Sequence, residues 1–317
     1  MPPSAPDAAP SSSPPDARHQ TTPPASSARK LPWRRIRWTV RAIAAAIILF
    51  MLLRGCDGAF YYPSRTTWFS PEEFGISRFE DVYFSTRDGI RLHGWWAPAV
   101  REARGTVIHF HGNAENITNH IALSAWLPGA GYNLLIFDYR GYGRSEGSVT
   151  RAGTILDGHA AIDYALSRTE VDRERLFVFG QSLGGAVAFY VVAERPEIRA
   201  LVIDSSFPSY RAIATAHARR MLPFHWLSDG AASLLVSDGY DPVDVVDRIP
   251  PRPLLVIASG RDNVCFPELG RALFDAAREP KQFWHVDDAG HCEAVLLRPD
   301  EATRRIRELF DSAAGAR

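Results

Sequence analysis

Short apolar runs alternate with longer stretches of helical periodicity from about residue 106 onward. The runs are rich in β-branched and aromatic residues and are nearly uninterrupted by polar ones, which is typical of strands buried on both faces. Strands are predicted at 106–110, 134–137, 176–179, 200–203, 254–258 and 283–286. Helices are predicted at about 115–127, 154–167, 182–194, 268–277 and 293–310. This alternation predicts an α/β fold, a mostly parallel sheet with helices on both faces.

Two segments depart from the alternation. Residues 79–84 and 90–97 flank Arg87-Asp88-Gly89 and predict an antiparallel hairpin at the sheet edge. Residues 205–247 interrupt the later part of the chain, with breaks at proline and glycine, and predict a short cap of two or three helices. Because chemistry in parallel sheets gathers at the carboxyl ends of the strands, we expect this cap to lie above the site.

The N-terminal part has a different composition. Residues 1–33 are mainly Pro, Ser and Ala and predict disorder, because such a segment buries too little apolar surface. Residues 34–57 hold an arginine-rich flank followed by the uncharged apolar run 42–53. Three interpretations stay open: an uncleaved signal anchor, a lipoprotein signal, or a buried helix of a soluble protein.

The lipoprotein interpretation rests on Leu53-Arg54-Gly55-Cys56, in which Cys56 is lipidated and the preceding residues are removed. Arg54 departs from that pattern, since a small residue is usual there. The anchor and the lipoprotein interpretations both predict membrane attachment through the N-terminal segment. They place residues 58–317, predicted to be one domain, outside the cytoplasm, on the periplasmic side in a bacterium.

Charge and cysteine content limit the partners and the compartment. The 317 residues include 36 basic and 36 acidic side chains, so no overall field favours nucleic acid as a partner. The expected partner is a small-molecule or acylated substrate. Cys265 and Cys292 lie in two loops that we expect to meet near the site, where they are either a disulfide or two unpaired buried thiols. The oligomeric state is not predicted.

The candidate nucleophile is Ser182 in Gly180-Gln181-Ser182-Leu183-Gly184, which joins a predicted strand to a predicted helix. A Gly-x-Ser-x-Gly turn in that position is sharp, so the glycines leave room for close backbone packing. The turn lifts the serine hydroxyl clear of the sheet and presents the next backbone N–H to a reacting oxygen.

A serine hydroxyl needs a base that takes its proton and an acid that orients the base. Asp262 follows the predicted strand 254–258, and His291 follows the strand 283–286. The chain order Ser182, Asp262, His291 therefore predicts a catalytic triad. Other carboxylates remain alternatives for the acid: Asp204 at the end of its own strand, and Asp287 and Asp288 in the loop of the base.

An oxyanion hole needs two backbone donors, and we expect the N–H groups of Leu183 and Asn113. Asn113 lies in the loop that follows the strand 106–110. His109 and His111 have the spacing of two metal ligands, but no third ligand is evident nearby, so no metal or other cofactor is expected. We expect His111 to support the oxyanion loop instead.

The segment Asp138-Tyr139-Arg140-Gly141-Tyr142 closes the strand 134–137. Asp138 and Arg140 are expected to brace this loop through hydrogen bonds and charge pairs. Tyr139 or Tyr142 is expected to line a pocket.

These linked motifs resemble the α/β-hydrolase superfamily. His-Gly-Asn-Ala-x-Asn, Asp-Tyr-Arg-Gly-Tyr-Gly-x-Ser-x-Gly, Gly-x-Ser-Leu-Gly-Gly, Gly-x-Asp and Gly-His are similar to the membrane-associated hydrolases related to eukaryotic α/β-hydrolase-domain protein depalmitoylases. The resemblance covers about residues 61–310 and implies an eight-stranded sheet and acyl transfer to water through a serine ester. Cys265, Phe266 and Cys292 depart from the family pattern, so protein depalmitoylation does not carry over with the fold.

The first hypothesis is therefore a membrane-anchored, extracytoplasmic serine hydrolase of carboxylic esters or thioesters. A serine peptidase of the prolyl-oligopeptidase type is an alternative, because such enzymes share this catalytic domain. A membrane-anchored binding protein without activity is a third hypothesis, and the complete set of Ser182, Asp262 and His291 argues against it.

Overall fold

The computed structural model describes residues 36–45, 58, 60–221 and 225–315. The chain divides into two units, residues 1–47 and 48–317. In the first unit, residues 36–45 form a helix. No helix within the described residues is long and apolar enough to cross a membrane. The predicted disordered segment 1–33 and residues 46–57 of the predicted anchor or lipoprotein signal lie outside the described residues.

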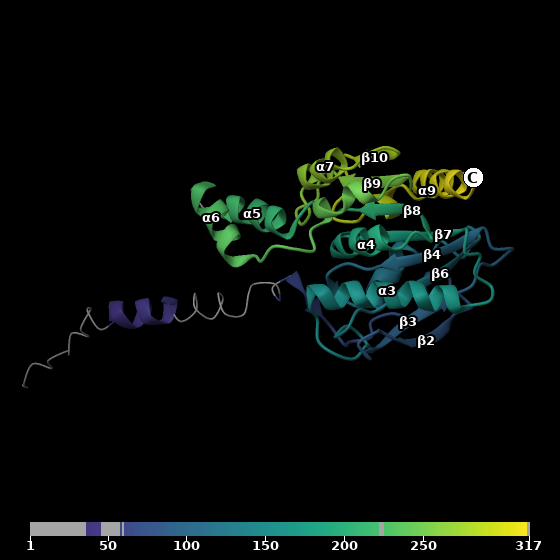
Figure 1. Ribbon diagram of the computed structural model, residues 1–317, viewed down its shortest axis with the longest axis horizontal. Coiled ribbons are helices and arrows are strands. Elements are labelled where there is room, and N and C mark those ends of the chain that lie inside the picture. The colour runs from purple at the N-terminus through teal and green to yellow at the C-terminus, as the bar shows by residue number, and fades with distance from the viewer. Residues whose placement is uncertain (1–35, 46–57, 59, 222–224, 316–317) are drawn as a thin grey trace, which may run out of the picture. The chain divides into compact units, whose positions relative to one another are not determined.

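The second unit is built on an eight-stranded sheet with the order β10-β9-β8-β7-β4-β6-β3-β2 (Figure 1). β2 pairs antiparallel with β3, and β3 pairs antiparallel with β6, whereas the remaining pairs are parallel. The predicted α/β fold with an edge hairpin is thus confirmed. The strands are β2 Glu80–Ser85, β3 Arg91–Ala97, β4 Gly105–Phe110, β6 Tyr132–Phe137, β7 Leu176–Gln181, β8 Ile198–Asp204, β9 Leu254–Ser259 and β10 Lys281–Val286.

Alternate residues of the strands feed two separate cores, one on each face of the sheet. Ile108 and Val178 pack in the core shared with α3 (Arg151–Ser167), α4 (Leu183–Glu194) and α7 (Pro267–Ala276). Val107 and Phe177 pack in the core shared with α9 (Pro299–Gly315). The central strands are buried along their whole length, which accounts for their unbroken apolar sequences.

Two predicted helices are wrong in extent. The helix predicted at 293–310 is divided into α8 (Ala294–Leu297) and α9, because Pro299 lacks an N–H group and begins a new helix. The helix predicted at 115–127 is only α2 (Ile117–His120), followed by the 3₁₀ helix η3 (Ile121–Leu123) and turns.

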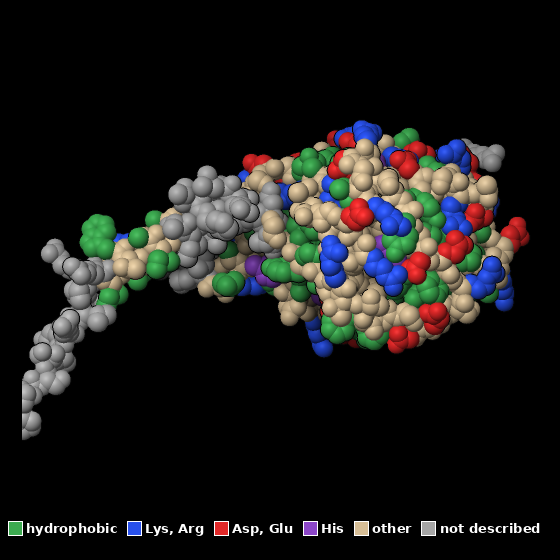
Figure 2. Space-filling view, turned by 90° about the horizontal axis from the view of Figure 1, so that it is seen from below, with side chains coloured by type: hydrophobic (Ala, Val, Ile, Leu, Met, Phe, Trp, Pro, Cys, Tyr) green, Lys and Arg blue, Asp and Glu red, His purple; other side chains and the backbone are tan. Residues whose placement is uncertain are grey.

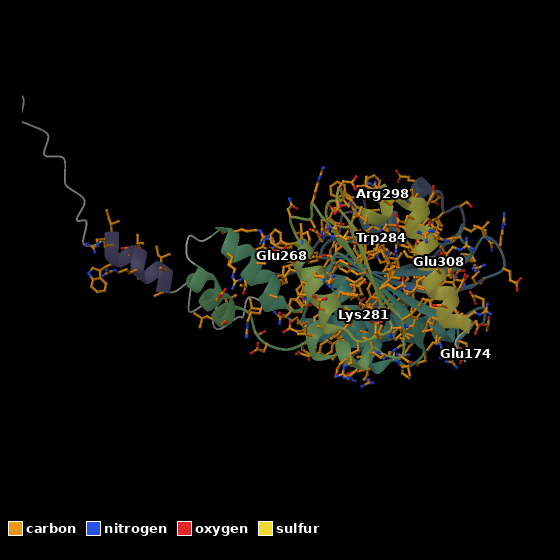
Figure 3. The ribbon with its side chains drawn as sticks, turned by 90° about the horizontal axis from the view of Figure 1, so that it is seen from above. Glu174, Glu268, Lys281, Trp284, Arg298 and Glu308 are labelled. Carbon is orange, nitrogen blue, oxygen red and sulfur yellow. The ribbon has the colours of Figure 1, made fainter. Side chains whose placement is uncertain are left out.

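The insertion between β8 and β9 contains α5 (Tyr210–Met221) and α6 (His225–Leu235), then the short helices η4 (Pro242–Asp244) and η5 (Val246–Arg248). Figure 1 shows α5 and α6 side by side, apart from the helices that cover the sheet. Arg220 Nη2 lies 2.8 Å from Glu268 Oε1 and links α5 to the start of α7, where Figure 3 labels Glu268. On the face of the molecule seen in Figure 2, basic and acidic side chains are interspersed.

The start of α4 packs closely against the end of β4 at Gly184. A β-carbon placed there would lie 2.1 Å from the carbonyl oxygen of Phe110 and 2.3 Å from that of His111. Both obstacles are backbone atoms, so a side chain at this position cannot be accommodated by a rotamer change.

We expect Gly184→Ala to lower the free energy of unfolding by about 3 kcal/mol or more, because the start of α4 must move away from β4. Urea titration followed by circular dichroism measures this loss. The matched control is Gly230→Ala in α6, where nothing lies within 4 Å of the added β-carbon. There alanine should raise the stability by up to about 1 kcal/mol. Equal effects of the two substitutions would contradict the packing argument.

Candidate active site

Ser182 lies at the turn between β7 and α4 and has a positive φ of 51°. A non-glycine residue is strained in this region, so the surrounding contacts must hold it there. The N–H of Ser182 donates to the carbonyl of Asp204 at 2.8 Å, and Ser206 Oγ donates to the carbonyl of Ser182 at 2.8 Å. The end of β8 therefore fixes the backbone of the candidate nucleophile on both sides.

The three residues predicted to form the triad lie together. His291 Nε2 lies 3.1 Å from Ser182 Oγ, and His291 Nδ1 lies 2.8 Å from Asp262 Oδ2. Because a carboxylate only accepts, Nδ1 donates the hydrogen bond to Asp262, which leaves Nε2 of the ring facing the serine hydroxyl. Ser182 is only 5% exposed and Asp262 is buried, whereas His291 is partly exposed.

The carboxylate of Asp262 is held by its own loop. Its Oδ1 accepts the backbone N–H groups of Val264 and Cys265, each at 2.8 Å. These two bonds stabilise a negative charge in a buried position and leave Oδ2 free to face His291. The turn 262–265 therefore presents the acid in one orientation.

The alternative acids have other surroundings. Asp204 Oδ1 accepts the hydroxyl of Ser205 at 2.9 Å, and burial raises the pKa of Asp204 to about 6. Asp287 pairs with His285, and Asp288 pairs with Arg298. Of the four candidate carboxylates, Asp262 is the one that bonds to His291.

The predicted oxyanion residues lie on adjoining elements. Leu183 begins α4, whose next residue, Gly184, abuts the backbone of Phe110 and His111 at the end of β4. Asn113 follows in the same loop, and its carbonyl accepts the hydroxyl of Tyr142 at 2.6 Å. The roles of the Leu183 and Asn113 N–H groups remain proposals.

Both tyrosines expected to line a pocket are instead fully buried. Tyr139 donates its hydroxyl to the carbonyl of His111 at 3.2 Å, while Tyr142 donates to Asn113. Their rings fill the space beneath the oxyanion loop, and their hydroxyls satisfy its carbonyls. Arg140 braces the adjoining segment through Asp157 and Asp88, as expected.

The histidines near the loop have structural partners. His111 Nδ1 lies 2.8 Å from the carbonyl oxygen of Gly112, and its ring stacks on His120. His109 is fully buried, and burial lowers its pKa to about 3. Within the described part of the chain, no group of three or more His, Cys, Asp or Glu side chains is arranged to hold a metal ion.

Two residues that the sequence did not single out join the nucleophile turn to the oxyanion loop. His120 Nδ1 lies 2.9 Å from Gln181 Oε1, and His120 Nε2 lies 2.7 Å from the carbonyl oxygen of Ala114. Gln181 directly precedes Ser182, so His120 bridges the two sides of the candidate oxyanion hole. Their separation of 61 positions gives no local signal of this contact.

Residues 60–69, which we term the strap, also hold the oxyanion loop in place. Its strand β1 (Tyr62–Pro63) pairs in parallel with β5 (Ala114–Glu115) of the oxyanion loop. The N–H of Tyr62 donates to Asn113 Oδ1 at 3.0 Å, and Asn116 Nδ2 donates to the carbonyls of Ser64 and Thr66. The strap thus forms part of the wall of the site.

The two cysteines near the site are free and buried. Cys265 Sγ lies 3.8 Å from Ser182 Oγ, and the N–H of Cys292 donates to Ser205 Oγ at 3.1 Å. Burial raises the pKa of both thiols. Of the two alternatives for this pair, the structure therefore has the unpaired thiols, which stay protonated and weakly nucleophilic.

Comparison with known proteins identifies relatives of this chain. A family profile described as "Serine aminopeptidase, S33" matches residues 101–248. The uncharacterized protein YfhR of Salmonella typhi is 36% identical over 268 residues, which are 80% of this chain and 86% of that protein. The α/β hydrolase domain-containing protein WAV2 of Arabidopsis thaliana is 32% identical over 216 residues, 64% of this chain and 68% of that protein.

Solved structures share the fold. The Pyrococcus furiosus esterase Pf2001 superposes with a TM-score of 0.66 and 26% identity, covering 81% of this chain and 99% of that one. An acetyl xylan esterase from Paenibacillus sp. R4 has a TM-score of 0.58 at 22% identity, covering 73% and 83% of the two chains, a likeness of fold alone.

The buried carboxyl of Asp204 predicts a pH dependence of stability. Its pKa of about 6 lies above the ordinary 3.8, so the folded state binds a proton that the unfolded state has released. The stability that this bound proton adds to the folded state is fully present below about pH 4 and is lost as the pH rises through 6. Relative to Asp204→Asn, the wild-type free energy of unfolding should therefore fall by about 2–3 kcal/mol between pH 4 and pH 7.

Urea titrations of both proteins at a series of pH values measure this difference. Asp287→Asn is the control, because the Asp287 carboxylate is almost fully exposed. Its difference from wild type should stay nearly flat over the same range. A flat difference for Asp204→Asn as well would show that the pKa of Asp204 is not raised in the folded protein.

Proposed function

Since this chain belongs to the α/β-hydrolase superfamily, we propose that it is a serine hydrolase that cleaves carboxylic esters or thioesters. The observation that carries the proposal is the pair of contacts made by His291, 3.1 Å to Ser182 Oγ and 2.8 Å to Asp262 Oδ2. A hydroxyl, a base and an orienting acid at hydrogen-bond distances are the arrangement that activates a serine.

In the first half of the reaction, His291 Nε2 takes the Ser182 proton as Oγ attacks the carbonyl carbon of the substrate. The negative charge that develops on the carbonyl oxygen is bound by the Leu183 and Asn113 N–H groups. Asp262 stabilises the imidazolium and keeps the ring oriented. When the tetrahedral intermediate collapses, the imidazolium gives its proton to the leaving alcohol or thiol, and an acyl-Ser182 ester remains.

In the second half, His291 takes a proton from water as the water oxygen attacks the acyl-enzyme. Collapse of the second intermediate returns the proton to Ser182 Oγ and releases the carboxylic acid. In these steps His291 transfers each proton, and the electron pairs come from Ser182 Oγ and from the water oxygen.

The substrate class is supported by the relatives and by the cap. The Pyrococcus furiosus neighbour, which shares 26% identity, is titled an esterase. The insertion between β8 and β9 holds two helices of 12 and 11 residues, which is small for a lid. We therefore propose that the site takes small esters and acyl groups attached to larger molecules.

A serine peptidase is the second candidate, because the matching family profile is described as a serine aminopeptidase. Peptide and ester cleavage use the same acyl-enzyme steps and differ in the leaving group, an amine in place of an alcohol or thiol. Turnover of substrates from both classes therefore separates the two candidates.

We further propose that the enzyme is anchored in the membrane by its N-terminal segment and works outside the cytoplasm. The supporting feature is the apolar run 42–53 with its arginine-rich flank, which favours a cytoplasmic N-terminus. Lipidation at Cys56 is the other route to the same membrane surface.

Ser182→Ala should abolish labelling by a fluorophosphonate probe and lower kcat for p-nitrophenyl esters at least about 10⁴-fold, because the nucleophile is lost. Labelling read by gel fluorescence and turnover of esters of graded chain length give the two measurements. Labelling that persists in Ser182→Ala would contradict the assignment of the nucleophile. Labelling of wild type with turnover of aminoacyl p-nitroanilides but not of esters would favour the peptidase.

The acid is tested by comparing Asp262→Asn with Asp204→Asn, two isosteric changes within one site. Asp262→Asn should lower kcat about 10⁴-fold, because His291 then loses its orienting carboxylate. Asp204→Asn should retain most of the turnover at pH 7.5. The reverse order of the two effects would make Asp204 the acid.

The anchor is tested by intact-mass analysis of protein extracted from membranes of the expressing bacterium. We expect a retained N-terminus and resistance to carbonate extraction. A mass that begins at an acylated Cys56 would identify a lipoprotein, and protein found only in the soluble fraction would contradict both routes.

A further inference from the structure

The strap begins only a few residues after the apolar run 42–53 and lies in the wall of the candidate active site. An extended chain advances at most about 3.5 Å per residue, so residues 53 and 60 are separated by no more than about 25 Å. A domain of this size is roughly 45 Å across. Any membrane anchor in that run therefore holds the strap closer to the bilayer than the width of the domain.

We term the edge of the domain at the carboxyl ends of the parallel strands, where Ser182, Asp262 and His291 lie, the mouth of the site, and the strap is fastened to two elements there. On one side, Tyr62 and Pro63 pair with the oxyanion loop. On the other side, the ring of Phe60 meets Tyr210 of α5 edge-on at 5.2 Å, and the hydroxyls of Tyr61 and Tyr210 lie 3.3 Å apart. The strap cannot move away from the mouth without breaking these contacts, so residues 60–63 stay at the mouth.

Exposed apolar side chains lie on the strap, on the turn after Asp262 and at the end of α5. Tyr62 and Trp68 project from the strap, with Trp68 53% exposed. Val264 is exposed two positions after Asp262, and its carbonyl oxygen lies 2.9 Å from His217 Nε2 of α5. Met221, one turn after His217, is 82% exposed. We term Tyr62, Trp68, Met221 and Val264 the rim.

Trp and Tyr side chains are favoured where acyl chains meet lipid headgroups, because their rings are apolar and their N–H or O–H groups stay hydrated. We infer that the rim lies against the bilayer surface, so that the mouth of the active site faces the membrane and receives long-chain acyl esters from it. This inference rests on the proposed function and adds the surface from which the substrate enters.

The test uses the full chain reconstituted in vesicles of phosphatidylcholine and phosphatidylglycerol. Turnover of p-nitrophenyl palmitate in the vesicles is divided by turnover of p-nitrophenyl butyrate in solution. Trp68→Glu and Met221→Glu place a charge where the bilayer should lie, so each should lower this ratio at least fivefold. Because Met221 is at the exposed end of α5, its substitution keeps the test valid if Trp68→Glu does not fold.

The matched control is Val100→Glu. Val100 is 71% exposed and lies in the loop before β4, at the opposite edge of the parallel strands. Its ratio should equal that of wild type. An unchanged ratio in both rim variants, or an equal fall in Val100→Glu, would overturn the inference.

Failure of the proposed function is recognised separately. A wild-type protein that is not labelled by fluorophosphonate and hydrolyses neither ester is not a serine esterase. A labelled protein that does not float with the vesicles lacks the anchor. If the protein is active and floats with the vesicles, but the rim substitutions leave the ratio unchanged, the proposed function stands and only the proposed orientation is wrong.

Discussion

The active site depends on the close contact between the start of α4 and the end of β4. Gly184 permits it, since any side chain there would meet the Phe110 and His111 carbonyls. The contact places the start of α4 beside the residues that lead into the loop with Asn113, and Ser182, directly before α4, has a positive φ. Hydrogen bonds to the end of β8 then offset the strain by holding Ser182 through both its N–H and its carbonyl.

Much of this was predictable from the sequence, because the deciding signals are local. Continuous apolar runs located the central strands, and the order Ser182, Asp262, His291 at strand ends placed three residues that the structure brings together. Helix ends and contacts across the fold were less predictable: Pro299 was a visible break within the stretch predicted as one helix, whereas the contact between Ser124 and His109 joins separate elements. Such contacts have no periodicity in the sequence.

The choice between two acids illustrates a further limit of sequence. Asp204 ends β8, Asp262 lies in the turn that follows β9, and both lie near His291, so position along the chain does not separate them. The difference is in their partners. Asp262 accepts two backbone N–H groups that stabilise its charge, whereas Asp204 is buried with one hydroxyl donor and its pKa is raised. Repulsion between the two nearby carboxylates adds to the effect of burial and contributes to the raised pKa of Asp204.

The strap follows the apolar run 42–53 in the sequence and contacts the loop that carries Asn113 in the candidate site. Its N–H at Tyr62 and the hydroxyl of Tyr142 both bond to Asn113, so the backbone of the oxyanion loop is positioned partly by the segment that leads from the apolar run. Backbone N–H donors stabilise a developing negative charge more effectively when they are held in place before the substrate binds. No free energy is then needed to reorganise the loop during the reaction. The strap therefore bears directly on the candidate site: it pairs with the loop that carries Asn113, and its N–H at Tyr62 bonds to the Asn113 side chain.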